Sequence, residues 1–185
     1  MTTVLIDGNN FYASCEQAMD PSLQDRPLVV LSNNDGCVIA RSAEAKSLEI
    51  RMGQPFFKIY KQLRALKVAV RSSNYALYGD MSKRFMTLLK SHCEELEIYS
   101  IDEAFAKVQR PYEKDLQPWA KELRNLICQN LGLPIAIGIG ANKTQAKLAN
   151  YLAKTISTNA GVFDFEVTDD PESWLECITI DNVWG

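Results

Sequence analysis

The sequence predicts an α+β fold in which a small α/β segment is inserted into a larger unit built from one sheet and its helices. Two observations carry this prediction. Apolar strands and helix-spaced apolar residues alternate along the chain, and a strand pair in the second half lies between two helical segments. If residues 11–74 are set aside, the remaining order is β, then αββαβ, then α, which is a ferredoxin-like layout with an insertion.

Each element follows from a local pattern. The first part of the chain is expected to form strand 2–7, helix 11–19, strands 27–32 and 37–41 around a turn at 33–36, helix 43–50 and a loop through Gly53 and Pro55. After the apolar run 68–70, residues 72–74 start a helix in which Leu77, Met81, Phe85 and Leu88 recur at helical spacing. Beyond the strand pair come helix 115–130, strand 134–140 and helix 143–154, and the last twenty residues show no clear pattern.

The composition is that of a globular protein, with 185 residues, 46% hydrophobic content and a net charge of −3. Asp7 interrupts the apolar N-terminus and no apolar run reaches membrane-spanning length, so we expect a cytoplasmic protein without a membrane contact. The five scattered cysteines are expected to be reduced. Because His92 is the single histidine, a zinc site with several histidine ligands is excluded. The acidic balance predicts that any DNA contact is local or lies outside this chain.

Three carboxylates, on Asp7, Asp102 and Glu103, form the candidate site. Carboxylates within a few ångströms of one another repel unless a cation neutralises them, and oxygen ligands without a Cys/His cluster favour Mg²⁺ or Mn²⁺ over Zn²⁺. Neighbouring strand residues point to opposite faces, so Asp102 and Glu103 converge only where the pleat is broken, as at a hairpin apex. A solvated acidic hairpin explains the same spacing equally well.

Three segments carry a resemblance to a known family: residues 7–16 (DGNNFYASCE), 32–41 (SNNDGCVIAR) and 99–105 (YSIDEAF). They resemble the Y-family translesion DNA polymerases, and within them the DNA polymerase V group, and the similarity extends to residues 183–185. The resemblance implies that residues 1–10 and 75–165 form the palm and 11–74 the fingers, and that 166–185 begin the connection to a thumb that is absent from this chain.

The activity implied by the resemblance is template-directed nucleotidyl transfer of the error-prone translesion type, in DNA repair and the SOS response. Asp7 and Asp102 match the carboxylates that bridge two Mg²⁺ ions, and Glu103 matches a further ligand. The primer 3′-oxygen would attack the α-phosphate of a dNTP and pyrophosphate would leave, with two metals stabilising the attacking and leaving oxygens. Primer-template DNA and dNTPs would be the substrates, with accessory SOS proteins as partners of the full-length protein.

The residues after Asp7 match the nucleotide contacts of the family. Gly8, Asn9, Asn10 and Phe11 join a strand to a helix, so that their N–H groups can point at a triphosphate. Tyr12 matches the steric gate, whose ring would clash with a ribose 2′-hydroxyl. An ordinary half-buried tyrosine is the alternative for Tyr12.

The remaining matches are less local. Lys143, Lys147 and Lys154 lie on one side of their predicted helix, and Lys154 matches a lysine that contacts the triphosphate, whereas the other two could face the DNA backbone or simply solvent. Lys46 and Ala43 stand where several relatives carry a phosphate-binding arginine and a tyrosine, and lysine lacks the bidentate fork of arginine. Ser32, Cys37 and Ile39 match residues over the nascent base pair, with plain hairpin packing as the alternative.

Two other functions remain open. One is a non-catalytic truncated polymerase module that binds partner proteins or nucleotide without extending primers. The other is a palm-fold nucleotidyl cyclase, for which a steric gate at Tyr12 would be out of place because ATP and GTP carry the 2′-hydroxyl.

Overall fold

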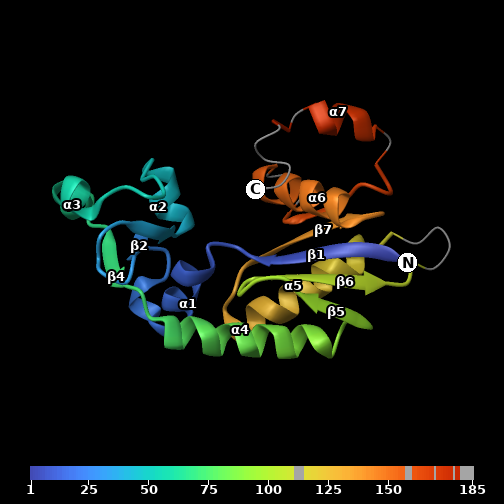
Figure 1. Cartoon of the computed structure of the whole chain (residues 1–185), viewed down its shortest axis with the longest axis horizontal. Helices are drawn as coiled ribbons and strands as arrows, with labels where there is room; N and C mark the ends of the chain where they lie inside the picture. Colours follow the sequence, from blue (N-terminus) through green and yellow to red (C-terminus); the bar gives the residue numbers. More distant parts are fainter. Residues whose placement is uncertain (111–114, 157–159, 169, 177, 180–185) are drawn as a thin grey trace. The chain divides into compact units, whose positions relative to one another are not determined.

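The computed structural model describes residues 1–110, 115–156, 160–168, 170–176 and 178–179 (Figure 1). The chain divides into two compact units. The larger unit comprises Met1–Gly8, Ser82–Asn130 and Pro134–Gly185, and the smaller unit comprises Asn9–Met81 and Leu131–Leu133. The boundary after Met81 falls inside helix α4 (Tyr75–Lys90). Palm and fingers with the boundaries given above remain a prediction.

A five-stranded sheet in the order β5-β6-β1-β7-β8 forms the larger unit (Figure 1). Its strands are β1 (Thr2–Gly8), β5 (Glu95–Ile98), β6 (Glu103–Val108), β7 (Ile135–Gly140) and β8 (Val162–Asp164). β1 is antiparallel to both β6 and β7, and β8 is parallel to β7. The chain order β1, α4, β5, β6, α5 (Gln117–Leu131), β7 with β1 between β6 and β7 is the ferredoxin-like layout, so the predicted fold class is confirmed.

Helix α6 (Lys143–Thr155) packs directly on the central strands β7 and β1, and Figure 1 shows α5 on the opposite side of the sheet. Glycine in β7 permits the close approach of α6. A Cβ on Gly138 would lie 2.2 Å from both the Ala146 carbonyl oxygen and the Asn150 amide nitrogen, so a side chain larger than hydrogen does not fit. Asn142 caps α6 by accepting a hydrogen bond from the Gln145 amide at 3.0 Å.

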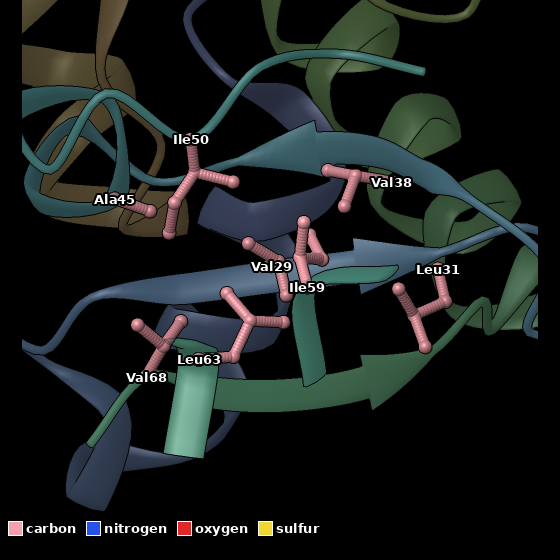
Figure 2. Close-up of a cluster of buried hydrophobic side chains, with 8 residues drawn as sticks. All are labelled: Val29, Leu31, Val38, Ala45, Ile50, Ile59, Leu63 and Val68. Carbon is pink, nitrogen blue, oxygen red and sulfur yellow. The ribbon is translucent and has the colours of Figure 1, made fainter. Parts of the chain in front are cut away.

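The smaller unit has a three-stranded sheet in the order β3-β2-β4. Its elements are α1 (Phe11–Met19), the 3₁₀ turn η1 (Pro21–Leu23), β2 (Leu28–Leu31), β3 (Val38–Arg41), α2 (Ala43–Ser47), α3 (Phe56–Ala65) and β4 (Ala69–Ser72). β2 is antiparallel to β3 and parallel to β4. Figure 2 shows the core of this unit, which is formed by Val29, Leu31, Val38, Ala45, Ile50, Ile59, Leu63 and Val68.

Several element predictions were wrong in detail. The helix predicted at 43–50 ends at Ser47, because Glu49 adopts a left-handed conformation with φ 58° that cannot continue it. Helix α3 was not predicted: Pro55 was interpreted as part of a loop, but it is the residue before the first turn, a place where proline's fixed φ is tolerated. β8 and the short helix α7 (Pro171–Glu176) were not predicted either.

The structure also shows the surroundings of the cysteines and of the single histidine, and the lengths of the helices. Cys15, Cys37, Cys93 and Cys128 form no disulfide within the described residues, and Cys177 lies outside them. His92 is exposed, and its Nδ1 lies 2.9 Å from the Leu88 carbonyl oxygen. Within the described ranges, no helix is both long and apolar enough to cross a bilayer.

Candidate functional site

Asp7 and Glu103 are cross-strand partners at one end of the β1/β6 ladder. Directly paired residues of antiparallel strands project from the same face, with their Cβ atoms about 4.5–5.5 Å apart. Two residues along each strand on that face, Leu5 and Phe105 pack together with Ala146 of α6. The carboxylates of Asp7 and Glu103 therefore lie on the sheet face that α6 covers.

Asp102 lies in the turn immediately before β6, where the strand pleat is interrupted as the sequence analysis required. Ser100 holds this turn: its hydroxyl donates to Asp102 Oδ1 at 2.8 Å and accepts from the Glu103 amide at 3.1 Å. The Gly8 amide donates to the Asp102 carbonyl oxygen at 2.8 Å, which ties the turn to the end of β1. The hairpin thus brings Asp102 to the same end of the sheet as Asp7.

Lysines on one side of α6 stand next to acids of the sheet. Lys154 Nζ lies 2.6 Å from Asp7 Oδ2, and Lys147 Nζ lies 3.8 Å from Glu103 Oε2. Lys143 Nζ lies 2.6 Å from Oε1 of Glu97 in β5. The shared side predicted from their spacing is confirmed, but it faces the sheet's carboxylates, so these lysines are not simply a solvated stripe.

The carboxylate cluster carries an electrostatic penalty. Burial raises the pKa of Asp7 to about 6; the neighbouring Lys154 ammonium opposes this shift and the Glu103 carboxylate adds to it. Burial also raises the pKa of Asp102, against the hydrogen bond from Ser100 and in the same direction as the charge of Asp7. A bound cation would relieve this penalty, and Lys154 supplies part of that countercharge.

The donor atoms fit hard divalent cations, which prefer carboxylate oxygens. Within the described parts of the chain, however, no three Asp, Glu, His or Cys side chains stand close enough together to hold a metal ion in their present positions. Asp7, Asp102 and Glu103 are gathered at one end of the sheet without forming a finished ligand set. One side-chain adjustment is evident: Lys154 would have to leave Asp7.

The segment after Asp7 presents backbone donors. Asn10 has a left-handed conformation with φ 53°, α1 begins at Phe11, and no side chain caps the helix, so the first-turn N–H groups have no partner from a cap. The Ser14 hydroxyl donates to the Asn9 carbonyl oxygen at 2.8 Å and fixes this turn. Asn9 Oδ1 is buried and accepts no hydrogen bond within the described chain, which is the condition of an acceptor awaiting a ligand or water.

Tyr12 is half-buried and belongs to an aromatic cluster in the smaller unit. Its ring stacks on Tyr78, with centroids 4.3 Å apart and an interplanar angle of 13°, and Tyr75 meets both rings edge-on at 6.0 Å. The buried Tyr78 hydroxyl donates to Glu16 Oε1 at 2.7 Å, and burial raises the pKa of Tyr78. Sequence reasoning missed Tyr75 and Tyr78; their i, i+3 spacing on α4 was the only available signal.

The residues that were predicted to act in the fingers lie on α2 and in the turn between β2 and β3. Lys46 and Ala43 are exposed on α2. The Ser32 hydroxyl accepts from the amides of Gly36 at 3.1 Å and Cys37 at 3.2 Å. These hydrogen bonds close the turn between β2 and β3, so Ser32 stabilises the hairpin.

Comparison with known proteins identifies relatives along most of the chain. The impB/mucB/samB family matches residues 6–151. The chain is 46% identical over 183 residues to protein UmuC of Salmonella typhimurium, covering 98% of this chain and 43% of that protein. It is 33% identical over 159 residues to DNA polymerase IV of Picrophilus torridus, covering 82% of this chain and 44% of that protein. The chain thus spans less than half the length of these relatives.

Solved structures of DNA polymerases share its fold. An insertion ternary complex of Dbh DNA polymerase superimposes with a TM-score of 0.83 at 25% identity, over 100% of this chain and 54% of the other. DinB from Sulfolobus solfataricus gives a TM-score of 0.80 at 25% identity, with the same coverage. The family predicted from the three sequence segments is therefore confirmed, and the chain belongs to the impB/mucB/samB family of Y-family translesion DNA polymerases.

Proposed function

We propose that the chain forms the palm and fingers of an error-prone translesion DNA polymerase of the UmuC type. The observation that carries this proposal is the meeting of Asp7, Asp102 and Glu103 at one end of the β1/β6 ladder, on a partly buried surface where burial raises the pKa of Asp7 and of Asp102. Residues 1–10 and 75–165 would be the palm, 11–74 the fingers, and 166–185 the start of the connection to a thumb.

Asp7, Asp102 and Glu103 would hold the two Mg²⁺ ions, or Mn²⁺. When bound, divalent cations at such a site neutralise charge on the attacking and leaving oxygens of an in-line phosphoryl transfer. Lys154 has a side chain 35% exposed, so it can leave Asp7 and bind the triphosphate of the incoming nucleotide. Ser100 would keep Asp102 ionised and oriented through its 2.8 Å hydrogen bond.

The segment after Asp7 and helix α1 would contribute further contacts to the nucleotide. The backbone N–H groups at Asn9, Asn10 and Phe11 would bind phosphate oxygens, as helix N-termini do, whereas the Gly8 N–H already donates to the Asp102 carbonyl oxygen. Tyr12 would stand against the sugar and exclude a 2′-hydroxyl, because the stacked Tyr78 ring limits how far it can yield. Lys46 would add one positive charge without the geometry of an arginine fork.

Primer-template DNA and dNTPs would be the substrates, and the Dbh structures, which are ternary complexes, support this choice. Accessory SOS proteins would join the full-length protein in the cytoplasm during the SOS response. The rival function is a module that binds nucleotide or partner proteins without catalysis. One observation favours it: the side chains now in place do not form a metal site within the described residues.

Thermal unfolding with Mg²⁺ plus dNTP or rNTP tests the proposal. A ligand at a hundred times its dissociation constant adds about 2.7 kcal/mol, which corresponds to roughly 5–10 °C for a chain of this size. We expect this shift for dNTP and not for rNTP, its loss in Asp102→Ala, and its retention in Glu122→Ala, which changes an exposed acid on α5. Tyr12→Ala should extend the shift to rNTP.

Primer extension then separates the two functions. In the full-length protein, Asp102→Ala or Glu103→Ala should abolish metal-dependent extension while the far-UV circular dichroism stays unchanged. A nucleotide shift that survives Asp102→Ala, or a mutant that still extends primers, would contradict the assignment of the metal ligands. A normal shift in a full-length protein that never extends primers would support the non-catalytic module.

A further inference from the structure

Helix α3 presents an unusual outer face. Its inner face carries Ile59 and Leu63, which are buried in the core of the smaller unit (Figure 2). At about 100° per residue, Phe57, Tyr60, Lys61 and Arg64 fall within an arc of roughly 100° on the opposite side. Phe57 is 72% exposed, more than any other large hydrophobic side chain in the described residues, and Tyr60 is 46% exposed.

The segment that contains α3 carries charge of one sign only. Residues 50–79 contain six basic side chains, Arg51, Lys58, Lys61, Arg64, Lys67 and Arg71, and no Asp or Glu. The whole chain carries −3, so the remainder carries −9. Arg71 pairs with Asp20 at 3.1 Å, whereas Lys58, Lys61 and Arg64 make no ion pair with any acid that the structure describes. The outer face of α3 is thus a basic surface on an acidic protein.

Exposed aromatic rings alternating with cations are the combination that binds single-stranded nucleic acid. Bases stack on the rings, and the cations neutralise phosphates without a sequence requirement. Lys58 Nζ already lies 5.8 Å from the Phe57 ring centroid, so a positive charge borders the stacking surface. A duplex would use the cations but not the rings, because its bases are already stacked.

We propose that the outer face of α3, defined as Phe57, Tyr60, Lys61 and Arg64 with Lys58 at its border, binds single-stranded DNA. In a polymerase of this family, that strand would be the unpaired template. The choice of DNA as ligand rests on family membership, but the surface shares no residue with the proposed nucleotide site. Its binding can therefore be measured without nucleotide or metal.

Fluorescence anisotropy of a labelled mixed-sequence DNA oligonucleotide, titrated with the chain at several salt concentrations, tests the proposal. Because bases stack on these rings, Phe57→Ala with Tyr60→Ala should weaken binding at least about tenfold at every salt concentration. Lys61→Gln with Arg64→Gln should instead reduce the slope of log K against log salt by about 1.4, because each phosphate contact on a single strand contributes about 0.7.

Matched controls change similar side chains elsewhere. Met19→Ala removes an apolar side chain that is 61% exposed on α1, and Lys121→Gln removes an exposed charge on α5; neither should alter binding. Far-UV circular dichroism and the nucleotide-dependent thermal shift should be unchanged in the α3 variants, which separates this inference from the proposed function. Absence of oligonucleotide binding by the wild-type chain at low salt, equal affinity for duplex, or full binding by the double aromatic variant would overturn the proposal. Full binding by the double aromatic variant would instead favour an acidic protein as the partner of this surface.

Discussion

Replacing Gly138 by alanine should destabilise the larger unit, because the new methyl group has no room. Its carbon would lie 2.2 Å from the Ala146 carbonyl oxygen and from the Asn150 amide nitrogen, and 2.7 Å from Asn150 Cα. Non-bonded heavy atoms rest about 3.5–4.0 Å apart, so α6 must move away from β7 by roughly 1 Å or more. All three obstructing atoms are backbone, and a rotamer change therefore cannot relieve the clash.

The cost has two parts. Overpacking of this kind costs about 1–3 kcal/mol. The movement also stretches the 3.0 Å hydrogen bond from Asn150 Nδ2 to the Ala136 carbonyl oxygen, both of which are buried, and such a bond contributes about 0.5–1.5 kcal/mol. We expect a total of about 2–4 kcal/mol, which lowers the melting temperature by roughly 5–15 °C.

Thermal unfolding followed by circular dichroism measures this effect, with Gly79→Ala as the matched control. Gly79 lies inside α4, and nothing is within 4 Å of a Cβ built on it. The same chemical change there should be neutral or stabilising by up to about 1 kcal/mol, because alanine favours helix over glycine. A Gly138→Ala protein that melts within about 1 °C of the wild type would refute the close packing of α6 on β7.

Three further predictions concern individual interactions. Without metal, Asp7 has a folded-state pKa of about 6 against an ordinary value of 3.8. The folded protein therefore binds more protons than the unfolded one between these values, and its stability should fall as pH rises from about 4 to 6. Asp7→Asn should flatten that part of the plot of urea midpoint against pH, and an unchanged plot would contradict the shift. Tyr78→Phe keeps the stack on Tyr12 but removes the hydroxyl that donates to Glu16, so the free energy of unfolding should fall by about 1–3 kcal/mol with little change in sugar selection. Tyr78→Ala removes the stack as well, and it should also weaken discrimination against rNTP in the thermal-shift assay. Arg110 pairs with the buried Asp164 and with Glu166, and Arg110→Ala should cost about 3 kcal/mol, most of which Asp164→Asn in the same chain should restore in urea unfolding.

Sequence reasoning succeeded where a pattern is local and strongly apolar. β1 and β7 are buried along their whole length, and each was predicted as a continuous apolar run. It failed where tertiary contacts decide. β8 has three residues and exists through parallel pairing with β7. Helix α3 was missed for another reason: Phe56, Ile59 and Leu63 recur at helical spacing, but Pro55 was interpreted as part of a loop.

Some features of the candidate site were likewise predictable from a local pattern, and others depend on tertiary contacts. The turn holding Asp102 was predictable, because two adjacent acids cannot share a strand face unless the pleat is broken. Helical spacing placed Lys143, Lys147 and Lys154 on one side, but it could not say that this side faces the acids of the sheet. The stack of Tyr78 on Tyr12 joins residues far apart in sequence, and their meeting depends on the fold.

The position of α6 couples the stability of the larger unit to the charge of the site. The helix approaches β7 closely only because Gly138 and Gly140 lack side chains, and the same helix carries the lysine that lies 2.6 Å from Asp7. Moving α6 outward would lengthen that ion pair and remove a countercharge that opposes the raised pKa of Asp7. Gly138→Ala should therefore raise the pKa of Asp7 further as well as lower the melting temperature. A variant that lost stability while keeping the pKa of Asp7 would show that Lys154 follows the carboxylate through its flexible stem, and that the glycines serve packing alone.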